Sequence, residues 1–246
     1  MAQSGSRDGI AVGGYVEAIV TDLRTGTYRE ERKRFRNTAT DWSFYACASW
    51  MAYQAQNNPA ASGAVLPPAY IAVGTGTSGQ TPAVTDTNMF MEQYDTRRAF
   101  TFSTVYNGYT AQLSLAYLAT DPDGTYTDAG LWDAPTQTVD LSAAVLAGAT
   151  TLPLDSGAPA VNGGTIAGQY TTAYINDGSS SEYVSIATTA SAGATSWTLQ
   201  SGLTYAHAIG TPVVAFVGHL FAHSAINVTK GYGQQLTIQW SIPFSN

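Results

Sequence analysis

Short apolar runs that stop at glycine-rich turns are the feature that most restricts how this 246-residue chain can fold. Residues 70–73, Tyr-Ile-Ala-Val, form one run, and residues 74–79 follow it with three glycines in six positions. Glycine weakens a strand and permits turns with positive φ, so the strand must end there. Residues 113–119 repeat this pattern before the turn sequence Asp-Pro-Asp-Gly at 121–124. Residues 236–244 alternate apolar and polar side chains, as half-buried strands do. The chain is therefore expected to be all-β.

One helix is expected among the strands. Thr40 or Asp41 can cap its N-terminus. Aromatic and small side chains then recur at steps of three and four residues through about residue 56, which gives one apolar face. Such a face is typical of core packing. The predicted fold is an antiparallel β-sandwich with one packed helix.

The composition changes after Trp132. Residues 147–157 and 192–202 are identical at seven of eleven positions, at an offset of 45 residues. Two copies predict a duplicated hairpin, because a solenoid needs three or more units. We therefore expect three parts. They are a flexible arm at 1–10, a main β-sandwich domain at 11–136 plus 216–246, and a small inserted β domain with the duplicated hairpin at 137–215.

The net charge of −7 is confined to one part of the chain. Residues 1–98 contain nine Lys and Arg and nine Asp and Glu, whereas residues 99–246 contain Lys230 and eight acids. Binding to nucleic acid requires several cations on phosphates, so the charge distribution disfavours that partner. Abundant Tyr and Trp instead favour protein contacts through neutral aromatic surfaces.

The densest charge run, residues 28–36, supplies the candidate interface residues. They are Arg29, Arg32, Lys33, Arg34 and Arg36. The run also contains two glutamates, and its simplest interpretation is a solvated strand or turn. The alternative is a cationic docking strip for an acidic partner or for the acidic half of another copy.

No residue pattern commits the chain to a metal or a cofactor, and none is expected. His219 and His223 have a spacing that on a helix could hold zinc. Their context predicts a strand, in which four residues span about 13 Å, so structural roles are expected. Residues 74–79 match the spacing of a dinucleotide-binding loop, but Pro82 and polar residues follow where a helix must begin.

No catalytic residue is assigned either. Four carboxylates, Asp121, Asp123, Asp128 and Asp133, crowd one region, and paired acids can cleave glycosides or bind Ca²⁺. The first two are explained more simply by a turn. Cys47 is the only cysteine, which excludes an intrachain disulfide. No run has the length of a membrane span, and the first residues do not resemble a signal peptide.

Three blocks of the sequence resemble a family of tailed-bacteriophage virion structural proteins. The first combines IAVGTGT at 71–77 and TPAVTDT at 81–87 with Glu92 and the Arg97–Arg98 pair. The second is DAGLWDA at 128–134, and the third is KGYGQQLTIQWSIPF at 230–244. The family often carries IAVGTGT…DT.L..E..R, EAGLWDA and K..G..LTI.W.I.F. Asp128 and Met89 depart from it, since the family has Glu and Leu there.

This resemblance covers roughly residues 36–135 and 216–246. It implies a non-enzymatic component of the virion, a tail, neck or fibre-anchoring protein assembled in the host cytoplasm, which docks to itself and to other virion proteins. The residues leave two rivals open, a glycan-binding adhesin for host recognition and a glycan-cleaving enzyme. Low charge density, many tyrosines and several edge strands predict a homo-oligomer, as a ring or trimer.

Overall fold

The computed structural model describes residues 14–24, 29–41, 43, 68–77, 79–103 and 110–243. Side chains are not described at Arg29 or at positions 101–103, 110–111 and 242–243. Over the described residues the chain is built almost wholly from antiparallel strands, with one short 3₁₀ turn, η1 (Gly178–Ser180), and helical backbone at Asp41 and Ser43. The expectation of an all-β fold is confirmed. The packed helix is not seen, because its span from residue 40 to 56 lies almost wholly outside the described residues, as do the N-terminal arm and Cys47.

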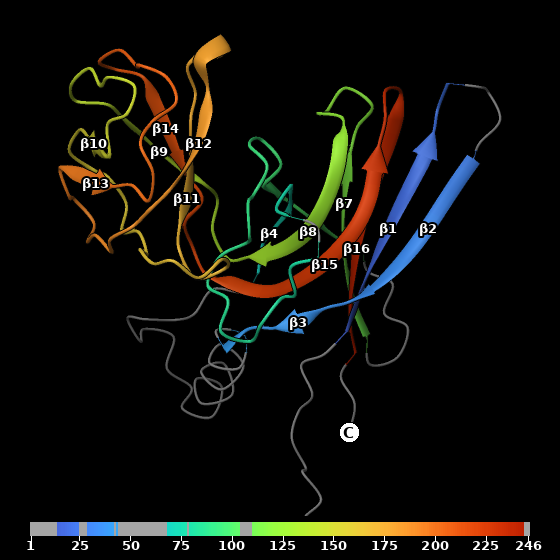
Figure 1. Cartoon of the computed structure of the whole chain (residues 1–246). Helices are drawn as coiled ribbons and strands as arrows, with labels where there is room; N and C mark the ends of the chain where they lie inside the picture. Colours follow the sequence, from blue (N-terminus) through green and yellow to red (C-terminus); the bar gives the residue numbers. More distant parts are fainter. Residues whose placement is uncertain are drawn as a thin grey trace, which may run out of the picture.

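Two five-stranded sheets form the main sandwich (Figure 1). Sheet A has the order β2-β1-β16-β7-β6, in which the strands are β1 (Tyr15–Asp22), β2 (Arg29–Arg36), β6 (Thr101–Ser103), β7 (Thr110–Tyr117) and β16 (Gln234–Pro243). Sheet B has the order β3-β15-β8-β4-β5, in which the strands are β3 (Thr38–Ala39), β4 (Tyr70–Gly74), β5 (Arg98–Ala99), β8 (Gly124–Trp132) and β15 (Leu220–Lys230).

The hydrophobic core lies between these two sheets. Sheet A contributes alternate residues of β1 and β16, for example Val16 and Trp240, which are fully buried. Sheet B contributes Ile71 and Leu131 from β4 and β8. Period-two alternation therefore produces one apolar face on each sheet, and the two faces pack together.

Sheet B is also covered on its other face, which makes it the central layer of the molecule. Met89 packs there against Ala72, Trp132 and Leu220. All five residues of β8 from Asp128 to Trp132 are buried as a result. The segment from 75 to 97 thus lies against a strand whose sequence, Asp-Ala-Gly-Leu-Trp, does not alternate as a half-exposed strand would.

The region 137–215, called the module below, consists of two equivalent three-stranded units. The first contains β9 (Gln137–Asp140), β10 (Thr151–Pro153) and β11 (Thr172–Ile175), and the second contains β12 (Glu182–Ser185), β13 (Ser196–Thr198) and β14 (Pro212–Ala215). One sheet has the order β12-β11-β14-β9, and β10 pairs with β13 in another. Exchanging the two units leaves both orders unchanged, so an approximate two-fold axis relates them.

This duplication is larger than the hairpin predicted from the sequence. The two copies of the eleven-residue repeat pair with each other, with Leu152 opposite Trp197. The module has its own hydrophobic core, all of whose buried members lie between Val139 and Val217. Its independent folding, and with it the proposed domain boundaries, stays a prediction.

Candidate functional site

Charged side chains meet beneath the segment 75–97, on the face of sheet B that looks away from sheet A. His223 of β15 is fully buried between two carboxylates. Its Nδ1 lies 2.8 Å from Asp86 Oδ2, and its Nε2 lies 3.1 Å from Asp128 Oδ2. The same two oxygens accept hydrogen bonds from the backbone N–H groups of Ala83 and Phe90, at 2.9 and 3.0 Å. The imidazole therefore joins the segment to two neighbouring strands.

The surroundings of His223 favour its protonated form. Burial by itself lowers the pKa of an imidazole, but the hydrogen bonds and charges of Asp128 and Asp86 outweigh it and raise the pKa of His223 above 6.5. An imidazolium can donate to both carboxylates at once, whereas a neutral ring can donate to only one of them. This arrangement is suited to holding two carboxylates in place.

A second buried pair lies on the same face of the sheet. Arg97 donates through Nε and Nη2 to the two oxygens of Glu92, at 2.8 and 2.6 Å, and both side chains are buried. Its guanidinium carbon lies 3.7 Å from the centre of the Trp132 ring. Its Nη1 donates to the carbonyl oxygens of Val217 and Ala134. Arg97 thus ties the segment 75–97 to the chain just before and just after the module.

A third buried cation closes the far end of sheet B. Lys230 at the end of β15 is fully buried. Its Nζ donates to Asp121 O at 2.7 Å and to Asp123 Oδ1 at 2.8 Å. The Asp121 carboxylate instead binds Arg98 at 2.8 Å. Burial raises the pKa of Asp121, but the hydrogen bonds from Arg98 and from the Leu118 backbone lower it overall.

Two glycines of the resembling blocks are explained by this packing. A Cβ on Gly74 would come within 2.3 Å of Asp128 Oδ1 and 2.5 Å of Met91 O. A Cβ on Gly130 would come within 2.6 Å of Met89 Sδ. All three distances are shorter than any non-bonded carbon contact allows, so glycine lets the segment 75–97 lie directly on β4 and β8.

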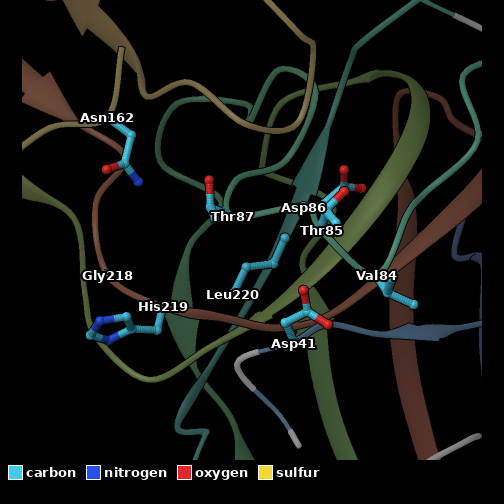
Figure 2. A pocket seen from close by; sticks show the side chains of 9 residues that line it. All are labelled: Asp41, Val84, Thr85, Asp86, Thr87, Asn162, Gly218, His219 and Leu220. Carbon is cyan, nitrogen blue, oxygen red and sulfur yellow. The ribbon is translucent and has the colours of Figure 1, made fainter. Parts of the chain in front are cut away.

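A pocket of about 330 Å³ opens beside the His223 cluster, where the module meets the sandwich (Figure 2). Its walls come from the segment 84–87, from 218–220 at the start of β15, and from Asn162 of the module. Asp86 is engaged by His223, and the exposed ring of His219 is paired with Asp133 at 2.7 Å. Two of the pocket's titratable side chains, Asp86 and His219, are therefore already engaged by other side chains of the chain.

The residues singled out from the sequence do not converge on one site. His219 and His223 are bound by different aspartates, and each of the four clustered acids is bound by a separate side chain: Arg98, Lys230, His223 and His219. Within the described ranges no three His, Cys, Asp or Glu side chains are arranged to hold a metal ion. In the same ranges no helix is long and apolar enough to cross a membrane.

The candidate interface residues lie together on β2, an edge strand of sheet A. Arg32, Lys33, Arg34 and Arg36 are exposed. Glutamates of the same chain bind the first three: Glu17 and Glu30 bind Arg32, Glu31 binds Lys33, and Glu17 lies 3.7 Å from Arg34. The guanidinium of Arg34 also lies 4.0 Å from the centre of the Tyr15 ring. The interpretation as a solvated strand with mixed charges fits this arrangement, and docking there stays a hypothesis.

Sequence reasoning missed the buried role of Glu92, Arg97 and Lys230. In the sequence they stand out only as positions of the phage-like pattern, and Lys230 also as the single Lys or Arg after residue 98. The usable signal was the low content of charged residues, which is 11% of the chain. A charged residue inside an apolar or glycine-rich run is then not explained by exposure to solvent, and it indicates a buried ion pair. Comparisons with protein-family models, with curated proteins and with solved structures found no match to this chain.

Proposed function

We propose that this chain is a non-enzymatic structural subunit of a bacteriophage particle, belonging to its tail, neck or fibre attachment. The observation that carries the proposal is where the phage-like residues lie. Asp86, Glu92, Arg97 and Lys230 belong to the first and third resembling blocks, and Asp128 stands in the second block where the family has Glu. All five side chains are buried in ion pairs around sheet B. The shared pattern therefore describes a framework, which is what a family of building blocks would have in common.

Such a framework suits a subunit that must present fixed surfaces to its neighbours. Buried ion pairs contribute little net stability, but they disfavour alternative packings in which a charge would lose its partner. Here they fix the segment 75–97, and the chain on either side of the module, on the sandwich. Assembly as a ring or trimer, with the helix at 40–56 packed on the sandwich, belongs to the same proposal.

Electron microscopy of antibody-labelled particles tests the proposal. An antibody raised against this chain should decorate one discrete position on intact phage particles. Particles that contain no copy of the chain would contradict it. Incubation with glycans of the host surface separates the two rival functions, because retention would indicate an adhesin and cleavage would indicate an enzyme.

A further inference from the structure

The two-fold relation within the module gives it two equivalent ends. At the inner end, Gly168 O accepts hydrogen bonds from the backbone N–H groups of Thr87 and Asn88, both at 2.8 Å, so this end is docked on the sandwich. At the outer end, the loops 142–148 and 204–210 are joined by the paired residues Val145 and His207. These loops lie at the upper left of Figure 1, away from sheets A and B.

The outer end carries three large exposed apolar side chains, whereas the inner end carries one, Ile166, which is 60% exposed. Leu146, Ile209 and Tyr205 are 77%, 66% and 44% exposed. The pair Val161 and Ala190 is the inner counterpart of Val145 and His207, which makes Ser191, Gly163 and Pro159 the inner counterparts of these three residues. Three large exposed apolar side chains on two loops that pair with each other indicate a contact surface at the outer end.

Hydrogen bonds to Asp177 and Glu182 also hold the loop 204–210 of the outer end in place. His207 is buried, with Nδ1 3.0 Å from Asp177 and Nε2 3.0 Å from Glu182. The Glu182 carboxylate further accepts the backbone N–H groups of Thr204 and Tyr205, at 2.8 and 2.9 Å. A loop fixed in this way presents Tyr205 in one position, and less entropy is lost when a partner binds.

The charge around the outer end selects the kind of partner. The module contains four acids, Asp140, Asp155, Asp177 and Glu182, and no Lys or Arg. Asp177 and Glu182 bind the outer loop, and Gly210 N donates to Leu141 O, next to Asp140. Two outer ends facing each other would bring these acids together, which costs free energy. A cationic surface is therefore the better partner.

Strand β2 provides such a surface on the same chain. Its cations outnumber its own two glutamates five to two, and their long aliphatic stems can cover apolar side chains while the charged groups face carboxylates. In the described part of the chain β2 is an edge strand, with no further strand of sheet A beyond it. Figure 1 places β2 on the opposite side of the molecule from the module, so the two surfaces of one chain cannot meet.

We propose that the outer end of the module, centred on Leu146, Tyr205 and Ile209, binds the β2 edge of a second copy of this chain. This inference rests on the self-assembly in the proposed function and specifies its geometry. The contact is head-to-tail, so each copy uses its outer end in one contact and its β2 edge in another. Repetition of the contact builds a ring when the rotation closes and a filament when it does not.

Mixing two defective variants tests the proposal. The first, Leu146→Ser with Ile209→Ser, removes the apolar surface, and the second, Arg32→Ser with Lys33→Ser and Arg34→Ser, removes the cations. Light scattering should give each variant alone a mass of 25.9 kDa, and their mixture a one-to-one dimer, because one intact contact can form between them. The control Leu118→Ser replaces an exposed leucine of the sandwich, 54% exposed, and should assemble like the unmodified chain.

The remaining outcomes overturn the inference in distinguishable ways. If the β2 variant assembles alone while the module variant does not, the outer ends bind each other or another surface, and the head-to-tail contact is wrong. If both variants assemble like the unmodified chain, self-assembly stands but uses other surfaces. If the unmodified chain is monomeric, the inference fails, and labelling of particles decides separately on the proposed function. Far-ultraviolet circular dichroism should be identical for all variants, since every changed side chain is exposed.

Discussion

Replacement of Arg97 by methionine tests whether the buried ions hold the segment 75–97 on the sandwich. Methionine approximates the length of the side chain but removes both hydrogen bonds to Glu92 and those to Val217 O and Ala134 O. The cation above the Trp132 ring is lost as well. Glu92 then stays buried without a countercharge, because its side chain is only 1% exposed.

The expected loss in the free energy of unfolding is about 3–5 kcal/mol, the usual result of removing one partner of a buried ion pair. For a chain of this size the loss corresponds to a Tm lower by roughly 6–20 °C. The exposed Arg32 is the matched control, since Arg32→Met also removes ion pairs but should cost less than about 1 kcal/mol. Thermal and urea unfolding followed by circular dichroism measure both changes.

The pH dependence of the Arg97→Met variant identifies the cause. Burial raises the pKa of Glu92, and Arg97 normally opposes this. Without Arg97 the folded pKa should rise further, so the variant should be most stable at low pH and lose stability as the pH rises through that value. Adding Glu92→Gln should restore part of the stability, because a neutral amide costs less to bury. A loss equal to that of Arg32→Met, or no recovery in the double variant, would refute the reasoning.

Three further predictions concern the surrounding structure. The folded pKa of His223 is raised, so its ion pairs should stabilise the chain fully below pH 6.5 and progressively less as the pH rises through the folded pKa. In the variant His223→Gln this part of the dependence of the unfolding free energy on pH should vanish. Gly168→Ala should lower the free energy of unfolding by about 1–3 kcal/mol in a urea titration, because φ is +83° and the new Cβ would lie 2.6 Å from Asp86 Oδ1. The control Gly164→Ala, with open space around the new Cβ, should stay within about 0.5 kcal/mol of the unmodified chain. Replacement of 137–215 by a short Gly/Ser linker should leave a cooperative melt, since the core between sheets A and B contains no residue of that region; an insoluble or gradually melting product would show that the boundary is wrong.

The sequence predicted the elements whose pattern is local. Apolar runs that end at glycines became β4 and β7, and the alternating C-terminal run became β16. The repeat was visible as well, but the pairing of its copies and the three-stranded size of each unit required tertiary contacts between strands that share few identical residues. Period and turn chemistry carry no information about such partners.

The candidate site was much less predictable than the fold. Asp86, Asp128 and His223 are separated by 42 and 95 residues, and nothing in their immediate neighbours shows that they meet. His223 was expected to be structural because of its strand context, and β15 provides that strand. Its two carboxylate partners depend on how the segment 75–97 folds back over sheet B. The outer end of the module was missed because single Leu, Tyr and Ile residues next to an alanine are typical of a core as well as of a surface.

The solution mass of the unmodified chain tests the central claim of a self-assembling subunit most directly. Sedimentation equilibrium should be measured at micromolar protein, first at low salt and then above about 0.15 M, where exposed charges farther apart than about 8 Å are screened. We predict a mass that is a multiple of 25.9 kDa at low salt and decreases as salt is added. A mass of 25.9 kDa under every condition would contradict the account.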